Sequence, residues 1–310
     1  MKWYFILLIV LAVIVFLVLL ISYICFYMTF YIKHRSGSEE KDIPKGELYD
    51  KYKDVIMDGI KKAKKIPYVQ YKSKSYDGLT LYAKFYEYKK GAPIEIMFHG
   101  YKGNAERDLG VGIERVFAVE RSAFIVDQRA AGLSEGKVVT FGIKEVKDCL
   151  MWIDFVIKTF GEDVKIVLTG ISMGAATVLM ASGYDLPKNV IGILADCGYN
   201  KASDIIKKVV KDMHLPASVF YPFIKLGARL YGGFNLEESS PYEQVQKCKV
   251  PVIFYHGDKD ELVPCDMSEK LYNACNSKKR LVTIKGAGHG ICYLLDPDKY
   301  VEELKDFFKE

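Results

Sequence analysis

Ser172 lies in the segment Gly170-Ile171-Ser172-Met173-Gly174, between a strand-like apolar run and a helix-like one. A serine in a Gly-x-Ser-x-Gly pattern can project from a sharp turn, because the two glycines carry no side chains that would collide there. The N–H of Met173 would then stand at the start of a helix, where it can stabilise a developing oxyanion. The alternative is a serine that only caps the helix. A nucleophilic role requires a general base and an orienting acid elsewhere in the chain.

The sequence offers candidates for both partners. His289, one of five histidines, lies in the glycine-rich segment "GAGHG" after the last strand-like run. The segment that follows an earlier strand-like run, "VIFYHG", supplies Asp258 and Asp260. The chain order Ser, Asp, His is the order of the α/β hydrolases. We therefore expect His289 to act as general base and one of the two aspartates to orient it.

The elements that must position these residues alternate along the chain. Short apolar runs that are typical of buried strands are separated mostly by helical segments; they lie at residues 94–99, 123–127, 164–170, 190–196 and 251–257. This alternation favours a mainly parallel sheet with helices on both faces. Two further strand-like runs flank Asp77-Gly78, which is a strong hairpin signal. The hairpin would stand at the start of the sheet.

From about Tyr68 onward the sequence resembles the α/β-hydrolase-fold serine hydrolases, and it is most similar to bacterial esterases of the monoacylglycerol-lipase and serine-aminopeptidase-like branch. The resemblance implies that Asp260 is the catalytic acid and Asp258 a turn residue. It also implies that "HGYKGN" forms the oxyanion loop, in which the N–H of Tyr101 is the second oxyanion donor. His99 would support this loop without transferring protons.

An uncharged apolar segment from Trp3 to Ile32 precedes the domain. It exceeds the roughly 20 residues that span a bilayer, and it is longer than the apolar part of a cleavable signal peptide. The sequence therefore predicts an uncleaved, single-pass signal anchor. Only Lys2 precedes this segment, whereas several basic residues follow it, which favours a cytoplasmic hydrolase domain. A large domain behind a signal anchor can also be exported, so the side of the membrane stays open.

We divide the chain into a transmembrane anchor at residues 1–35, a juxtamembrane linker with an amphipathic helix at 36–67, and an α/β-hydrolase domain at 68–310. Within the last part, an insertion at about 199–242 separates two strands and contains two helical segments. Phe220 and Phe223 on its second helix are candidates for the wall of an acyl pocket. The alternative is that this apolar face packs on the body of the domain.

Other classes of function lack the patterns that they require. The net charge of +5 is spread along the chain rather than gathered in a basic stripe, so we expect no nucleic-acid partner. The seven cysteines include no C-x-x-C pair, and no His-Glu-x-x-His motif occurs. We therefore expect no metal and no cofactor.

Together these residues predict a membrane-anchored serine hydrolase, either a carboxylesterase or a lipase-like enzyme, that acts on a small-molecule or lipid-like acyl substrate. Two alternatives remain open at this point. One is a peptidase or acyltransferase with the same triad, and the other is a membrane-anchored binding protein that has lost turnover. The sequence gives neither the physiological substrate nor the oligomeric state.

Overall fold

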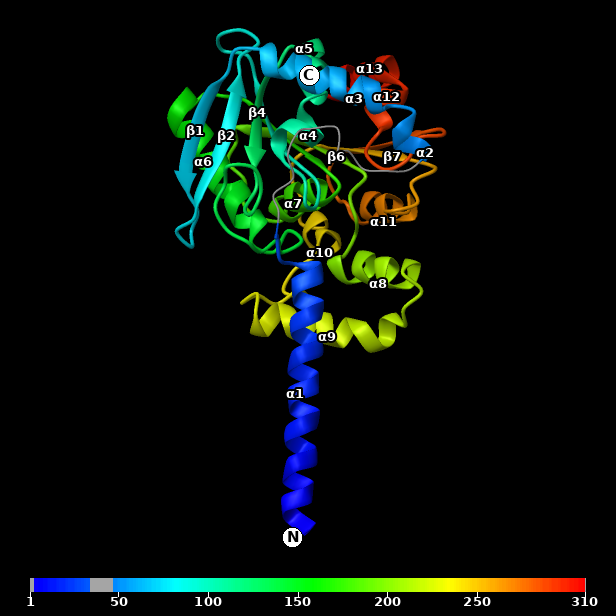
Figure 1. The fold of residues 1–310 in the computed structure, drawn as a ribbon. Helices are drawn as coiled ribbons and strands as arrows, with labels where there is room; N and C mark the ends of the chain where they lie inside the picture. The colour runs from blue at the N-terminus through cyan, green and yellow to red at the C-terminus, as the bar shows by residue number, and fades with distance from the viewer. Residues whose placement is uncertain (1–2, 34–46, 310) are drawn as a thin grey trace.

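The computed structural model describes residues 3–33 and 47–309 and contains one eight-stranded sheet (Figure 1). Its strands are Val69–Lys74 (β1), Thr80–Tyr86 (β2), Ile94–Phe98 (β3), Ser122–Asp127 (β4), Ile166–Ile171 (β5), Val190–Asp196 (β6), Val252–Gly257 (β7) and Lys279–Ile284 (β8). They follow the order β1-β2-β4-β3-β5-β6-β7-β8. Strands β3 to β8 are parallel, whereas β2 pairs antiparallel with β1 and β4. The predicted mainly parallel sheet is confirmed.

The hairpin at the start of the sheet also forms as predicted. Strands β1 and β2 pair from Val69 opposite Phe85 to Lys74 opposite Thr80. Gly78 in the turn between them has a φ of +87°, a conformation that glycine adopts without a steric penalty.

Helices cover both faces of the sheet. The helices of the described residues are Trp3–Thr29 (α1), Glu47–Asp50 (α2), Lys53–Lys65 (α3), Ala105–Leu109 (α4), Gly112–Ala118 (α5), Glu145–Phe160 (α6), Met173–Ala181 (α7), Ala202–Asp212 (α8), Ala217–Leu230 (α9), Pro241–Val245 (α10), Asp266–Ala274 (α11), Cys292–Leu295 (α12) and Pro297–Phe307 (α13). Successive side chains of a strand point to opposite faces. Accordingly, Ile96 and Phe98 of β3 join the cluster that contains α6 and α7, whereas Met97 joins the cluster of α4 and α5.

The region between the anchor and the sheet differs in detail from the prediction. The single amphipathic helix expected there is two helices, α2 and α3. Ile56 and Ile60 form the buried stripe of α3. The linker expected at residues 36–46 lies outside the described residues, and the proposed boundaries of the three parts remain a prediction.

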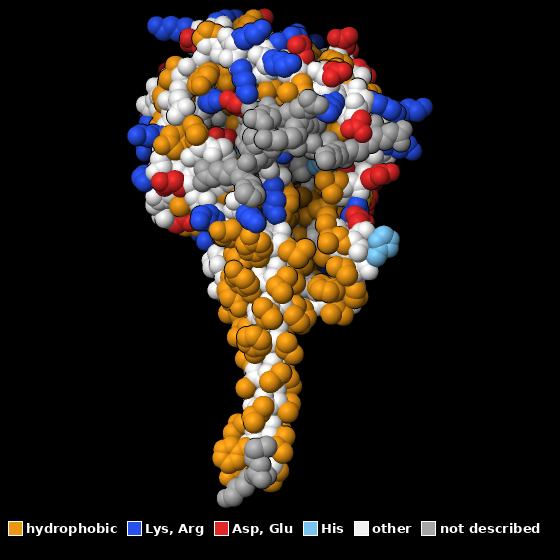
Figure 2. Space-filling model, viewed as in Figure 1, with side chains coloured by type: hydrophobic (Ala, Val, Ile, Leu, Met, Phe, Trp, Pro, Cys, Tyr) orange, Lys and Arg blue, Asp and Glu red, His pale blue; other side chains and the backbone are white. Residues whose placement is uncertain are grey.

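Helix α1 extends away from the domain along most of its length (Figure 1). It is long and apolar enough to cross a membrane, and hydrophobic side chains cover it and continue onto the adjoining end of the domain (Figure 2). Its end, in contrast, is built into the domain, because Phe26 of the helix and Phe30, which directly follows it, are buried. The approach of α9 to α1 requires glycine at Gly227, since a Cβ there would lie 2.4 Å from the backbone oxygen of Ser22.

Candidate active site

Ser172 stands in the turn between β5 and α7. Its φ of +56° falls in a region that non-glycine residues rarely adopt. The two glycines of the motif are required by close packing: a Cβ on Gly170 would lie 2.1 Å from the backbone of Gly174, and one on Gly174 would lie 2.0 Å from the backbone oxygen of Phe98. This strained turn is the arrangement of a nucleophile elbow, with the serine side chain at its apex.

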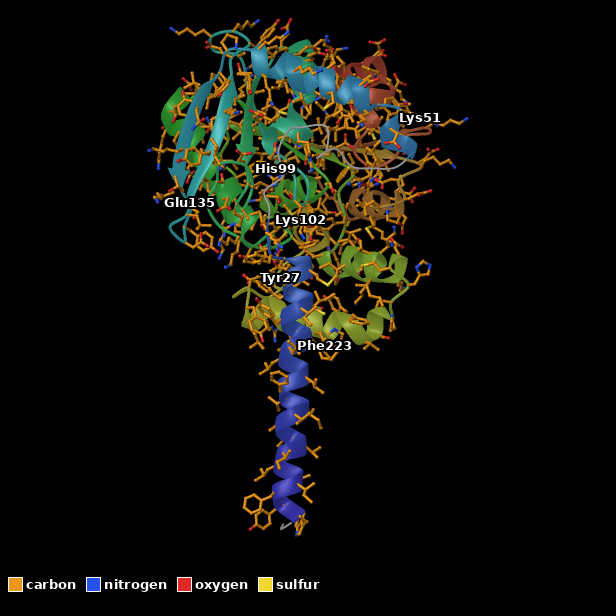
Figure 3. All side chains as sticks on the ribbon, viewed as in Figure 1. Tyr27, Lys51, His99, Lys102, Glu135 and Phe223 are labelled. Carbon is orange, nitrogen blue, oxygen red and sulfur yellow. The ribbon has the colours of Figure 1, made fainter. Side chains whose placement is uncertain are left out.

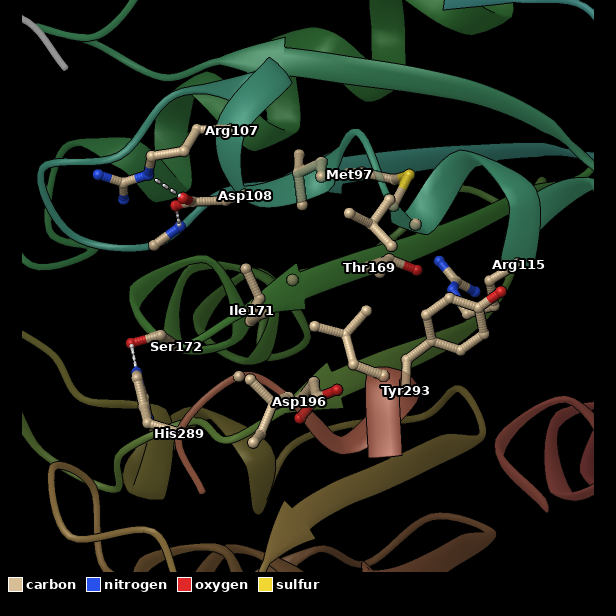
Figure 4. Close-up of a pocket in the computed structure, with 18 of the residues that line it drawn as sticks. Met97, Arg107, Asp108, Arg115, Thr169, Ile171, Ser172, Asp196, His289 and Tyr293 are labelled. Atoms are coloured by element: carbon tan, nitrogen blue, oxygen red, sulfur yellow. Dashed lines mark hydrogen bonds and ion pairs between the residues drawn. The ribbon is translucent and has the colours of Figure 1, made fainter. Parts of the chain in front are cut away.

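The structure brings Ser172, His289 and Asp260 together, as the sequence predicted. Nε2 of His289 lies 2.9 Å from Oγ of Ser172, and Nδ1 lies 2.7 Å from Oδ2 of Asp260. Figure 4 shows the contact between Ser172 and His289 at one end of a pocket. With a proton on Nδ1, the imidazole can accept the serine proton at Nε2, which is the geometry that general-base activation needs.

Asp260 is held as a buried carboxylate. Its Oδ1 accepts hydrogen bonds from the N–H groups of Leu262 and Val263, at 3.0 and 2.8 Å. Burial alone would raise the pKa of Asp260, but hydrogen bonds from His256 and His289 outweigh it and lower the pKa to about 2. Asp260 is therefore ionised at neutral pH and can stabilise a positive charge on His289.

The neighbouring aspartate has a different position. Oδ1 of Asp258 accepts a hydrogen bond from the N–H of Gly286 at 2.6 Å, in the loop that leads to His289. Asp258 therefore fixes the loop and does not contact the imidazole, in keeping with the turn role that the resemblance implied.

His256 is a contributor that the sequence did not single out. It is fully buried, and its Nε2 lies 3.2 Å from Oδ2 of Asp260 and 2.7 Å from the backbone oxygen of Val263. Its Nδ1 lies 2.6 Å from the hydroxyl of Ser268. A histidine at the end of a buried strand, four residues before the acid, was the only signal of this contact. Through it His256 helps to position Asp260.

The loop after β3 carries the predicted oxyanion donor Tyr101. Phe98 of β3 pairs with Gly170 of β5 in a parallel register. Tyr101 lies three residues after Phe98, and Met173 lies three residues after Gly170, so both follow the same edge of the sheet. Among the described residues, neither of their N–H groups has a hydrogen-bond acceptor. Both amides are thus free to donate to an oxyanion beside Ser172.

The loop itself is fixed by polar contacts. The N–H of Gly100 donates to Oδ2 of Asp108 at 3.0 Å. Buried His99 accepts the N–H of Gln128 at Nε2 and lies 2.8 Å from the backbone oxygen of Gly100 at Nδ1. Burial lowers the pKa of His99 and favours its neutral form. His99 therefore supports the loop, in agreement with the expectation from sequence.

A cavity of about 440 Å³ opens at Ser172 and His289. Its wall is mainly apolar and comes from β3, β5, β6 and the helices α3, α4, α5 and α12; among its residues are Ile56, Met97, Leu109, Ile171, Leu194 and Leu294. A volume and lining of this kind suit a small apolar ligand. The attacking oxygen of Ser172 would stand at the mouth of this cavity.

Phe220 and Phe223 are not among the residues that line this cavity, so their acyl-pocket role stays a prediction. Both side chains are partly buried against the main core cluster. Helix α9 packs against the end of α1, a contact that the division of the chain into an anchor and a hydrolase domain does not predict. Phe223 lies on α9 where that helix passes α1 (Figure 3).

The fold defines an α/β hydrolase, and comparison with known proteins agrees. Residues 140–310, more than half of the chain, match the prolyl oligopeptidase family, and the chain belongs to that family. The resemblance to α/β-hydrolase-fold serine hydrolases that the sequence suggested is confirmed.

Individual relatives are distant. The chain is 25% identical over 187 residues to the uncharacterized protein YqkD of Bacillus subtilis, covering 60% of this chain and 61% of YqkD, less than two thirds of that protein. It is 26% identical over 232 residues to the protein bem46 of Schizosaccharomyces pombe, covering 72% and 70% of the two chains. A solved structure of the Pyrococcus furiosus esterase Pf2001 has a TM-score of 0.64 at 20% identity, over 80% of this chain and 93% of the esterase.

Proposed function

We propose that this protein is a membrane-anchored serine hydrolase that cleaves acyl esters through Ser172, His289 and Asp260. The observation that carries the proposal is the continuous contact from Ser172 Oγ through the imidazole of His289 to Asp260, at 2.9 and 2.7 Å, with the serine in a strained turn. A serine that only capped α7 would not need this arrangement, and its side chain makes no capping hydrogen bond.

In the proposed reaction, Oγ of Ser172 attacks the acyl carbonyl while Nε2 of His289 takes its proton. The N–H groups of Tyr101 and Met173 bind the developing oxyanion. The protonated imidazole, stabilised by Asp260, then gives the proton to the leaving alcohol. Water hydrolyses the acyl-enzyme by the same steps, and the chain's own residues perform each of them.

The shape of the site supports an ester with an extended acyl group. The cavity beside Ser172 has a mainly apolar wall, so it stabilises alkyl groups more than polar ones. The esterase Pf2001 shares the fold, which is compatible with this substrate class. We propose acyl groups of medium length as preferred substrates over acetyl esters.

A second candidate is hydrolysis of peptide bonds, and the match to the prolyl oligopeptidase family favours it. The same triad attacks amides and esters, so the chemistry of the site is shared. Parallel assays of p-nitrophenyl esters and of peptidyl p-nitroanilides on the full chain in detergent micelles distinguish the two. A kcat/KM for the anilides that equals the kcat/KM for the esters would favour the peptidase.

We also propose that α1 crosses the membrane once. Its first 20 residues, from Trp3 to Ser22, are mostly exposed and apolar, which is about the length that the hydrocarbon core requires. Tyr231 of the loop after α9 contacts the ring of Tyr23 and donates a hydrogen bond to the backbone oxygen of Leu19. The domain would therefore rest at the membrane surface, where lipid-like esters are concentrated.

Replacement of the nucleophile tests the proposal directly. We expect Ser172→Ala and His289→Ala to lower esterase kcat by about 10⁴-fold or more, because triad members act as a unit. Labelling with a fluorophosphonate should be lost in Ser172→Ala and retained in Ser218→Ala, a control on the exposed face of α9. Wild-type protein that neither labels nor hydrolyses any ester would instead support the silent binding protein.

The two aspartates supply a matched pair of variants. We expect Asp260→Asn to lower kcat by about 10⁴-fold, because an amide at this position selects the wrong tautomer of His289. Asp258→Asn removes charge from the same loop without touching the imidazole, so its loss should stay within about tenfold. Equal losses of kcat in the two variants, measured with the same ester, would contradict the orienting role of Asp260.

A further inference from the structure

The cavity that begins at Ser172 has a charged group at its far end. Arg115 lines the cavity and donates from Nη2 to Oε1 of Glu95. Arg121 donates from Nη1 to Oε2 of the same carboxylate at 3.2 Å, and the hydroxyl of Thr169 donates to Oε1 at 2.7 Å. All three charged side chains are buried. Figure 4 shows Arg115 at the opposite end of the pocket from Ser172 and His289.

The charges in this cluster do not balance. Two guanidinium groups share the single carboxylate of Glu95, which leaves an excess of one positive charge in a buried region. Arg121 is not among the residues that line the cavity, and its guanidinium rests on the ring of Phe308 at 4.6 Å. Arg115 therefore presents the excess charge to the cavity.

Arg115 also has an unused donor. Among the described residues, no acceptor lies within hydrogen-bond distance of its Nη1, although that atom is buried. A buried charged donor without a partner is costly, so a small rotation of the guanidinium that brings Nη1 to an acceptor in the cavity would be favourable. Asp196, another carboxylate of the cavity, pairs with Ile171 in the register of β5 and β6 and accepts a hydrogen bond from the hydroxyl of Tyr300 at 2.9 Å. Burial raises the pKa of Asp196.

The register of β5 gives the separation between the two ends. Thr169, which binds the same oxygen of Glu95 as Arg115 does, precedes Ser172 by three residues of chain. Because a strand rises about 3.3 Å per residue and β5 ends at Ile171, the Cα atoms of Thr169 and Ser172 lie no more than about 10 Å apart. Apolar side chains, including Met97 and Ile171, line the cavity that joins them.

We infer that the cavity selects acyl groups whose far end carries a carboxylate, with Arg115 as the residue that binds it. The inference rests on the proposed attack by Ser172 at the other end of the same acyl group. An apolar chain of medium length would contact the cavity wall, and its terminal carboxylate would accept hydrogen bonds from the free Nη1 of Arg115. The substrate class is thus the monoesters of medium-length dicarboxylic acids.

The first test needs only the wild-type full chain in non-ionic detergent micelles. Its substrates are the p-nitrophenyl monoester of suberic acid and the same compound with the free carboxylate capped as a methyl ester. We expect kcat/KM for the free acid to exceed that for the capped ester at least tenfold. A capped ester that is hydrolysed equally well or better overturns the inference, whereas failure to hydrolyse either compound or p-nitrophenyl octanoate overturns the proposed function.

The second test assigns the selectivity to a residue. The ratio of kcat/KM for the free acid to that for the capped ester should fall about tenfold or more in Arg115→Gln. Arg121→Gln is the matched comparison, since it removes an equal charge from the same carboxylate outside the cavity wall; its ratio should fall clearly less than that of Arg115→Gln, because Arg115 keeps its Nη1 donor. Partial unfolding affects both substrates alike, so it leaves the ratio unchanged. An equal fall in both variants would assign the effect to the charge cluster as a whole and contradict the role of Arg115.

Discussion

The two sides of Ser172 use apolar residues in opposite ways. On one side, α3, α4, α5 and α12 surround an open cavity. On the other side, the apolar face of α9 is occupied by the end of α1, and Phe26 and Phe30 fill the space between the insertion and the sheet. An apolar stripe near Ser172 therefore identifies a substrate wall only when no other segment of the chain covers it.

Helix α1, which covers this side, also contacts the loop after β3 that carries Tyr101. The hydroxyl of Tyr101 donates to the backbone oxygen of Thr29, and Nζ of Lys102 donates to the backbone oxygen of Met28 at 3.0 Å. Both acceptors belong to the last turn of α1, where unpaired carbonyl groups and the negative end of the helix dipole favour such donors. Lys102 and Tyr27 accordingly lie close to the end of α1 in Figure 3. Helix α1 and the loop after β3 are thereby connected.

The largest effect that we expect from this comparison is on stability. Phe30 is fully buried, and its ring lies against those of Phe141 and Phe234. Phe30→Ala should lower the free energy of unfolding by about 3–5 kcal/mol, because it leaves a cavity in the core. Phe16→Ala, on the exposed part of α1, is the control and should leave the unfolding midpoint in detergent micelles unchanged.

This experiment distinguishes a helix α1 that is only attached to the domain from one whose end stabilises the fold. Equal unfolding midpoints for Phe30→Ala and the wild type would mean that the end of α1 does not stabilise the domain. The packing at the end of α1 would then not be a stabilising part of the core, and the two sides of Ser172 would no longer differ in this respect.

A smaller effect distinguishes the two sides by substrate selectivity. Leu294 of α12 lines the cavity, whereas Phe223 of α9 does not. We expect Leu294→Ala to lower the ratio of kcat/KM for p-nitrophenyl octanoate to that for the acetate by about fivefold, since each lost methylene contact is worth about 0.8 kcal/mol. Phe223→Ala should leave this ratio within about twofold. The reverse pattern would restore the insertion as the acyl wall.

Much of the site was predictable because it depends on local sequence and chain order. The turn around Ser172 requires small residues at Gly170 and Gly174 for steric reasons, so the motif identifies the turn directly. The parallel strands were visible as apolar runs, and the carboxyl ends of parallel strands meet at one edge of a sheet. For this reason the chain order predicted that Ser172 and His289 meet one of the two aspartates Asp258 and Asp260, and the family resemblance selected Asp260.

The contacts of α9, the cavity and the charge excess at Arg115 depend instead on pairs of residues that are distant in sequence. Amphipathic α9 has the same pattern whether its apolar face meets a ligand or another helix, since burial in either case removes the same surface from water. Likewise, Glu95, Arg115 and Arg121 are ordinary charged residues until the fold buries all three together. The strand, turn and helix that present Ser172 follow from the local sequence. The apolar and charged groups that face the empty space beside it depend on packing between distant segments, because that packing sets which surfaces remain uncovered.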